Sequence, residues 1–155
     1  MLSARSPHLF PSVTKQGVSA IFETSGNDTC HVILRGGSRT GPNFDAAHVD
    51  EACTRLKARG LRETVMIDCS HGNSQKDHRK QTAVAASIAE QVCAGSWRVM
   101  GAMLESHLVE GRQDYVAGRA AYGQSITDAC LSFDQTEPIL EQLATAQTKR
   151  TRRHG

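Results

Sequence analysis

The sequence has no long hydrophobic run, no strong excess of either charge and no CxxC cysteine pair. No stretch of about 18 apolar residues occurs, so no transmembrane helix is predicted, and residues 1–10 lack the apolar core of a secretory signal. With a formal net charge of +2, we expect neither nucleic acid nor a membrane as partner. Five cysteines, an odd number, favour a reducing, cytoplasmic compartment with mostly buried thiols.

The length and apolar content suit one domain. A chain of 155 residues with 39% hydrophobic residues can bury a core of ordinary size. We therefore expect a single domain over 1–155, with flexible ends at 1–8 and 148–155. The basic segment 149–154 is interpreted as the solvated end of a helix, where cations favour the helix dipole, rather than as a nucleic-acid site.

Short apolar runs alternate with longer helical patterns along the chain. Strands are predicted at 9–15 (interrupted by Pro11), 31–35, 64–68 and 99–104. The alternation of strands and helices predicts an α/β fold with a parallel sheet. An open doubly wound sheet and a (βα)8 barrel both fit this pattern, although a full barrel needs about 200 residues or more.

Three helices are predicted between and after these strands. Asp45 caps the first helix and Gly60 ends it as the residue after the C-cap; Gly95 ends the second. The third begins near Thr136, with Pro138 in its first turn. Their apolar positions follow helical spacing: Val49, Ala52, Cys53 and Leu56; Val84, Ile88 and Val92; and Ile139, Leu140 and Leu143.

Polar residues follow three of the predicted strands. They are Arg35, His71 and Glu105. Strand alternation places each of them on the same face as the strand residues two and four positions before it. Because active sites of parallel α/β folds lie at the C-terminal ends of strands, we expect these three side chains to converge.

His71 and Glu105, with Asp128 as a third ligand, would make a divalent-metal site. Imidazole and carboxylate oxygen suit manganese, iron, cobalt or zinc. The alternative is that His71 is merely a structural residue. Cys69 could also offer a thiolate, but a small buried residue is the simpler interpretation. His107 and Glu110 could orient these ligands or only pack a loop.

Arg35 is followed by two glycines, which suggests an anion site. A guanidinium group binds phosphate or carboxylate with paired hydrogen bonds, and glycine lets backbone approach the anion. A surface ion pair is the alternative. Asn73 and Ser74 either cap the second helix or, with Lys76, hold an anion at its start.

Five segments together resemble the type I 3-deoxy-7-phosphoheptulonate (DAHP) synthases. They are SVTK at 12–15, HVILRGG at 31–37, VMIDCSHGNS at 65–74, MLESHLVEG at 103–111 and YGQSITDAC at 122–130. Several long motifs in one order are far more specific than a single short pattern. The similarity runs from about residue 10 onward.

The resemblance implies a fold and a reaction. The fold would be a partial (βα)8 barrel of parallel strands, about strands 5 to 8 with their helices. The reaction condenses phosphoenolpyruvate with erythrose 4-phosphate, the first step of the shikimate pathway and of aromatic amino-acid biosynthesis. His71, Glu105 and Asp128 match family metal ligands, with His71 and Asp128 also catalytic. Arg35 matches an arginine that binds phosphoenolpyruvate, and Asp128 would also contact the sugar phosphate.

Other functional residues of the family have no counterpart in this chain. They are a fourth metal ligand, a cysteine, and a cluster of lysines and arginines that binds both substrates. We therefore expect activity only when a complementing N-terminal portion is present; a homo-oligomer would not supply the missing residue types. The alternative is an inactive remnant or interaction protein of the same fold. An unrelated metal hydrolase with the same ligands is a third hypothesis.

Overall fold

The computed structural model describes residues 1–154 and the side chains of residues 1–152. The chain forms two compact units, Met1–Val32 and Ile33–Gly155, of which Gly155 lies outside the described residues. The expectation of one domain with flexible ends at 1–8 and 148–155 stays a prediction, and its last residue is not described.

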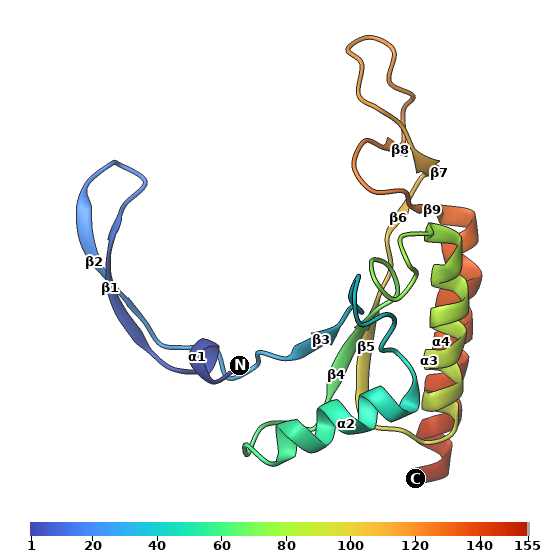
Figure 1. Cartoon of the computed structure of the whole chain (residues 1–155), viewed down its shortest axis with the longest axis horizontal. Helices are drawn as coiled ribbons and strands as arrows, with labels where there is room; N and C mark the ends of the chain where they lie inside the picture. The colour runs from blue at the N-terminus through green and yellow to red at the C-terminus, as the bar shows by residue number, and fades with distance from the viewer. Residues whose placement is uncertain (155) are drawn as a thin grey trace. The chain divides into compact units, whose positions relative to one another are not determined.

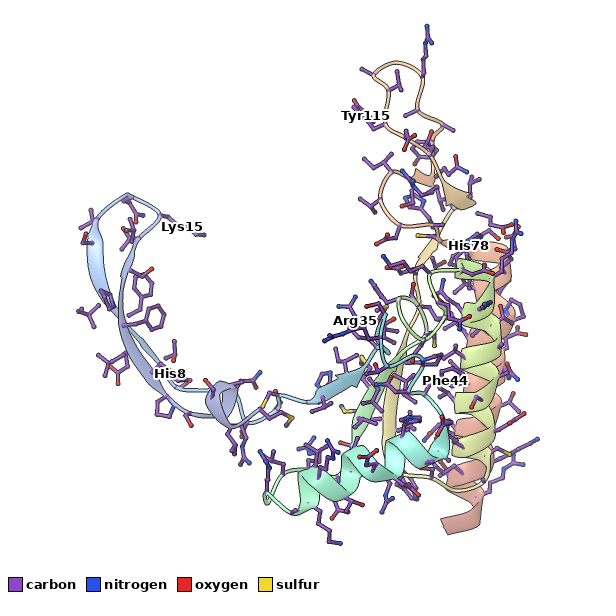
Figure 2. All side chains as sticks on the ribbon, in the orientation of Figure 1. His8, Lys15, Arg35, Phe44, His78 and Tyr115 are labelled. Atoms are coloured by element: carbon purple, nitrogen blue, oxygen red, sulfur yellow. The ribbon has the colours of Figure 1, made fainter. Side chains whose placement is uncertain are left out.

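The first unit is a β-hairpin preceded by a short helix. After α1 (Leu2–Arg5), β1 (His8–Val13) pairs antiparallel with β2 (Ser19–Thr24), with His8 opposite Thr24 and Lys15 in the turn (Figures 1 and 2). The sequence predicted β1 as a member of the parallel sheet and missed β2. That prediction is wrong because the chain reverses at Gly17, whose φ of +79° suits a tight turn.

The second unit contains the sheet that the apolar runs predict. Its strands are β3 (Val32–Leu34, whose first residue belongs to the first unit), β4 (Val65–Asp68) and β5 (Val99–Met103), in the order β3–β4–β5. β4 and β5 pair in parallel, which confirms an α/β fold with parallel strands. Val65 and Ile67 are fully buried.

Helix α2 (Ala46–Lys57) follows the prediction closely. Asp45 accepts a hydrogen bond from the His48 N–H at 3.1 Å, and this bond is the main reason that the pKa of its carboxyl lies below the ordinary value. The buried side chains are Val49, Cys53 and Leu56. The C-cap is Ala58, so Gly60 (φ +63°) lies one residue later than predicted.

Helix α3 (Gln81–Cys93) begins later than predicted. Asn73 and Ser74 lie in an irregular turn, and the short 3-10 helix η1 (His78–Lys80), capped by Asp77, precedes α3. The predicted start is wrong because Gln75 and Lys76 adopt left-handed backbone, which no α-helix accommodates. The predicted buried face of Val84, Ile88 and Val92 is confirmed, and Gly95 (φ +106°) follows the C-cap Ala94.

Helix α4 (Phe133–His154) begins three residues before the predicted start, so Pro138 lies beyond its first turn. A capping box explains the difference: the Gln135 N–H donates to Ser132 Oγ at 3.2 Å, and the Ser132 N–H donates to Gln135 Oε1 at 2.8 Å. Ile139 is buried as predicted, but Leu140 is 52% exposed. α3 and α4 pack against each other (Figure 1).

Short strands that the sequence analysis missed lead into α4. β6 (Ser106–His107) pairs in parallel with β9 (Leu131–Ser132), and β7 (Val109–Arg112) pairs in parallel with β8 (Gln124–Ser125). Asp128 lies between β8 and β9. None of the described helices has the length and apolar character needed to cross a membrane.

Candidate metal centre

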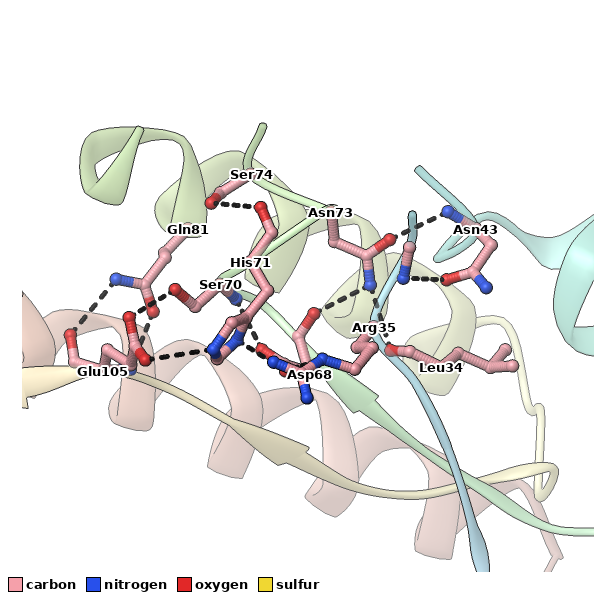
Figure 3. Close-up of polar contacts among 11 residues, drawn as sticks. Leu34, Arg35, Asn43, Asp68, Ser70, His71, Asn73, Ser74, Gln81 and Glu105 are labelled. Atoms are coloured by element: carbon pink, nitrogen blue, oxygen red, sulfur yellow. Dashed lines mark hydrogen bonds and ion pairs between the residues drawn. The ribbon is translucent and has the colours of Figure 1, made fainter. Parts of the chain in front are cut away.

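Polar side chains from the ends of the three sheet strands meet in one region (Figure 3). Arg35 directly follows β3, Asp68 ends β4, and Glu105 lies two residues after β5. His71 lies in the turn after β4. The predicted convergence of Arg35, His71 and Glu105 is therefore present in the structure. Figure 2 shows Arg35 at the end of β3 and His78 in η1, next to the start of α3.

His71 reaches this region by a different route from the one predicted. Strand β4 ends at Asp68, so strand alternation does not extend to His71. His71 instead has a φ of +49°, in the left-handed region that few non-glycine residues adopt. The alternation argument is therefore wrong for His71, because a turn and not a strand directs its side chain.

The His71 imidazole lies between two carboxylates. Its Nε2 is 3.5 Å from Glu105 Oε1, and its Nδ1 is 2.8 Å from Asp68 Oδ2. Although Nδ1 is buried and close to Asp68, it makes no hydrogen bond of acceptable angle to any described residue. The ring therefore has one nitrogen beside a buried carboxylate, and the other faces Glu105.

Asp128 completes a group of three possible ligands, His71, Glu105 and Asp128, which we call the metal group. One ligand atom each from His71, Glu105 and Asp128 lie within 4.8 Å of one another. They line a hollow of about 120 Å³ together with Ser70, Lys76, His78 and Ala129. An imidazole nitrogen and two carboxylate oxygens at this spacing fit the coordination chemistry of a divalent transition-metal ion. An imidazole backed by a carboxylate, here Asp68, is typical of metal-bound histidines.

Asp68 and Ser70 support this group, and the sequence analysis assigned neither a role. The Ser70 N–H donates to Asp68 Oδ1 at 2.8 Å, and the Ser70 hydroxyl donates to Glu105 Oε2 at 2.6 Å. Asp68 is only 2% exposed. Asp followed two residues later by a backbone donor is a common turn pattern, which could have indicated that Asp68 orders this loop.

Gln81 fixes the backbone of Glu105. Its side-chain Nε2 donates to the Glu105 carbonyl at 3.1 Å, and its Oε1 accepts from the Glu105 N–H at 2.8 Å. Gln81 is completely buried. Its position three residues before Val84, on the apolar face of α3, is a sequence signal for such a role, because a buried glutamine must find polar partners.

Asn73 holds the ends of β3 and β4 together. Its Nδ2 donates to the Leu34 and Asp68 carbonyls at 3.0 and 2.7 Å, and its Oδ1 accepts from the Asn43 N–H at 2.8 Å. The prediction that Asn73 caps a helix is therefore wrong. A Cβ on Gly36 would lie 2.6 Å from the Gly72 carbonyl carbon, so the close crossing of two loops requires glycine there.

Glu110 joins η1 to β7 and α4. It accepts hydrogen bonds from His78 Nε2 at 2.8 Å, Arg79 Nε at 3.0 Å and Gln135 Nε2 at 3.1 Å. These bonds, with that of His78 the largest, lower the pKa of the Glu110 carboxyl to about 2. His107 is exposed, and its Nδ1 accepts from the Leu108 N–H. Of these two residues, Glu110 is the one linked to the hollow, through His78.

Cys69 has the properties of a buried structural thiol. It is 0% exposed, and burial raises the pKa of its thiol to about 12, with the nearby Asp68 charge adding to the effect. A metal ligand would be a thiolate. The structure thus supports the interpretation of Cys69 as a small core residue.

Comparisons with known proteins agree with the motifs. The model of the DAHP synthetase I family matches residues 1–141. A phospho-2-dehydro-3-deoxyheptonate aldolase from Haemophilus influenzae is 50% identical over 145 residues, covering 93% of this chain and 40% of the relative. The Phe-sensitive aldolase of the same name from Escherichia coli K12 is also 50% identical, covering 93% of this chain and 41% of that protein.

The chain is also similar to a solved structure of a protein with the same name. The phospho-2-dehydro-3-deoxyheptonate aldolase from Francisella tularensis SCHU S4 matches with a TM-score of 0.90 and 52% identity, covering 96% of this chain and 43% of that one. The chain thus spans about two fifths of the length of these relatives. The family match over residues 1–141 confirms the resemblance found in the sequence, and the chain belongs to the DAHP synthetase I family.

Proposed function

We propose that this chain supplies the metal site and part of the phosphoenolpyruvate site of a DAHP synthase, as about strands 5 to 8 of a (βα)8 barrel. The observation that supports this most directly is the approach of His71, Glu105 and Asp128 to within 4.8 Å of one another. It is supported further by relatives that are 50% identical to the chain and are named phospho-2-dehydro-3-deoxyheptonate aldolases.

The reaction would join phosphoenolpyruvate to erythrose 4-phosphate. A carbon–carbon bond forms between the enol carbon and the aldehyde carbon, water adds to the resulting cationic centre, and phosphate leaves. A divalent ion (Mn, Fe, Co or Zn) held by His71, Glu105 and Asp128 would act as a Lewis acid on the aldehyde oxygen.

The chain's own residues would bind and orient the reactants. The Arg35 side chain is 58% exposed, and only its Nε approaches a carboxylate, 3.7 Å from Asp68 Oδ2. The guanidinium thus has donors free for the phosphoenolpyruvate anion. Asp128 is exposed at the edge of the metal group, where it would also accept a hydrogen bond from a sugar hydroxyl. The Asp68 carboxylate, 2.8 Å from His71 Nδ1, would favour one orientation of the imidazole ring.

Catalysis would require the part of the relatives' length that this chain does not cover. Most of the work at such a site is electrostatic clamping of two phosphorylated substrates, and Arg35 alone is a small part of it. We therefore propose that the isolated chain binds metal and makes no product.

Reconstitution tests this proposal. The chain is mixed, or fused, with the part of the Haemophilus influenzae relative that it does not match, and the heptulosonate product is measured with both substrates and Mn²⁺. We expect product from the combination, none from either part alone, and none when the chain carries His71→Ala. A folded combination that binds metal but forms no product would favour the alternative of an inactive remnant.

A further inference from the structure

A second hollow adjoins the metal group and has a cationic lining. It has a volume of about 540 Å³. The lining residues are Arg35, Gly36, Gly37, Ser38, Gly41, His71, Gly72, Gln75 and Lys76. This set contains a guanidinium and an ammonium but no carboxylate. Two acids that are not part of the lining approach it. The buried Asp68 lies 3.7 Å from Arg35 Nε and 2.8 Å from His71 Nδ1, and Glu105 lies 3.5 Å from His71 Nε2.

Lys76 belongs to both hollows. Together with His71, it lines the larger hollow and also the smaller one that contains Glu105 and Asp128. Within the described residues, the Lys76 ammonium has no ion pair or side-chain hydrogen bond, whereas the neighbouring Lys80 donates to Gln75 Oε1 at 2.5 Å. The structure thus leaves one cation unneutralised between an anion-sized space and the metal group.

The backbone around Lys76 is held in an unusual conformation. His71, Gln75 and Lys76 have φ angles of +49°, +56° and +63°, three left-handed non-glycine residues within six positions. Such residues are strained, and where several persist they typically mark functional sites. The Lys76 N–H donates to the His71 carbonyl at 2.8 Å, which closes the loop and ties Lys76 to the metal-ligand candidate.

We propose that Lys76, which lines this hollow together with Arg35 and His71, is a second cation for a phosphoryl group bound there. Two cations match the dianionic charge of a phosphate monoester, whereas a carboxylate carries a single charge. The inference deepens the proposed function, in which the phosphoryl group would belong to phosphoenolpyruvate. Its test nevertheless needs no turnover.

Titration with inorganic phosphate tests the proposal on the intact, metal-free chain. Backbone amide NMR shifts of Gly36, Gly37 and Gly72 are followed at constant ionic strength, with acetate in a parallel titration. We expect saturable phosphate binding at these glycines and weaker acetate binding. Lys76→Gln should weaken phosphate binding about tenfold or more, as the loss of a charge-assisted hydrogen bond does, and Lys76→Arg should stay within about threefold of the unaltered chain.

Lys80→Gln is the matched control, because Lys80 lies four residues away and does not line the hollow. It should bind phosphate as the unaltered chain does. The proposal is overturned if no saturable shift occurs, if Lys76→Gln binds as well as the unaltered chain, or if Lys80→Gln weakens binding equally. Product from the reconstituted enzyme together with any of these results would leave the proposed function standing without this role for Lys76.

Discussion

Replacing Gln81 with leucine tests whether a residue that supports the metal group, but is not itself a ligand, affects metal binding. Leucine has a similar volume but makes neither of the two hydrogen bonds that Gln81 forms with the Glu105 backbone. The Glu105 carbonyl keeps a second partner, the Leu131 N–H at 3.0 Å. The Glu105 N–H, in contrast, loses the only partner recorded among the described residues. The substitution thus leaves one unpaired donor and removes no possible ligand atom.

The expected magnitude follows from these contacts. A lost hydrogen bond costs about 0.5–1.5 kcal/mol and a buried unpaired donor about 1–3 kcal/mol, so the free energy of unfolding should fall by about 1.5–4.5 kcal/mol. Because the Glu105 carboxylate would no longer be held toward His71, affinity for Mn²⁺ should fall about 10- to 100-fold, as for other groups that orient metal ligands.

Two measurements on the purified chain check this prediction. Urea denaturation gives the stability, and the EPR signal of free Mn²⁺ gives the affinity. Gln91→Leu is the matched control, since Gln91 lies in the same helix and donates to the Phe44 carbonyl at 2.9 Å instead. Gln91→Leu should lower stability without changing affinity. If Gln81→Leu behaves in the same way, Gln81 is only a structural residue and the reasoning is refuted.

Three further predictions concern other groups. Because the Glu110 pKa, about 2, lies below its ordinary 4.5, its ion pairs stabilise the fold fully above about pH 4.5 and progressively less toward pH 2. Glu110→Gln should therefore lower stability at pH 7 in urea denaturation, but not near pH 2. Asp45→Ala should cost about 1 kcal/mol of unfolding free energy through the lost cap, and an unchanged urea midpoint would contradict this. In native protein at pH 8, mass spectrometry should find iodoacetamide on the partly exposed Cys30 and Cys93 but not on Cys69, with its thiol pKa of about 12; equal labelling would contradict the buried thiol.

The sequence predicted the elements whose signals are local. Apolar runs located β4 and β5 to within one residue, and Asp45 marked the start of α2. Arg35, His71 and Glu105 were expected together because the ends of neighbouring parallel strands share one edge of a sheet. Their positions at one edge of the sheet follow from that general property, whereas the proposed substrates came only from the family resemblance.

The supporting contacts were not predictable in the same way. The left-handed turn at His71 is flanked by long-range hydrogen bonds, from Ser70 to Glu105 after β5 and from Asn73 to Leu34 in β3, so no local pattern of the chain predicts it. The position of Gln81 on the apolar face of α3 indicates that it needs polar partners, but the sequence does not identify the partner, Glu105, which lies 24 residues later. The prediction for β1 was wrong for a different reason. The apolar residues of this segment suggest a buried strand of the parallel sheet, but no residue of β1 or β2 is buried within the described first unit.

The stoichiometry of Mn²⁺ binding, measured by EPR, tests the central claim most directly. The account predicts one ion per chain, loss of that ion in His71→Ala, Glu105→Gln and Asp128→Asn, and full binding in the control Asp114→Asn, whose side chain is 88% exposed and lies outside the metal group. Metal content unchanged in His71→Ala would contradict the assignment of these three residues as a single metal site.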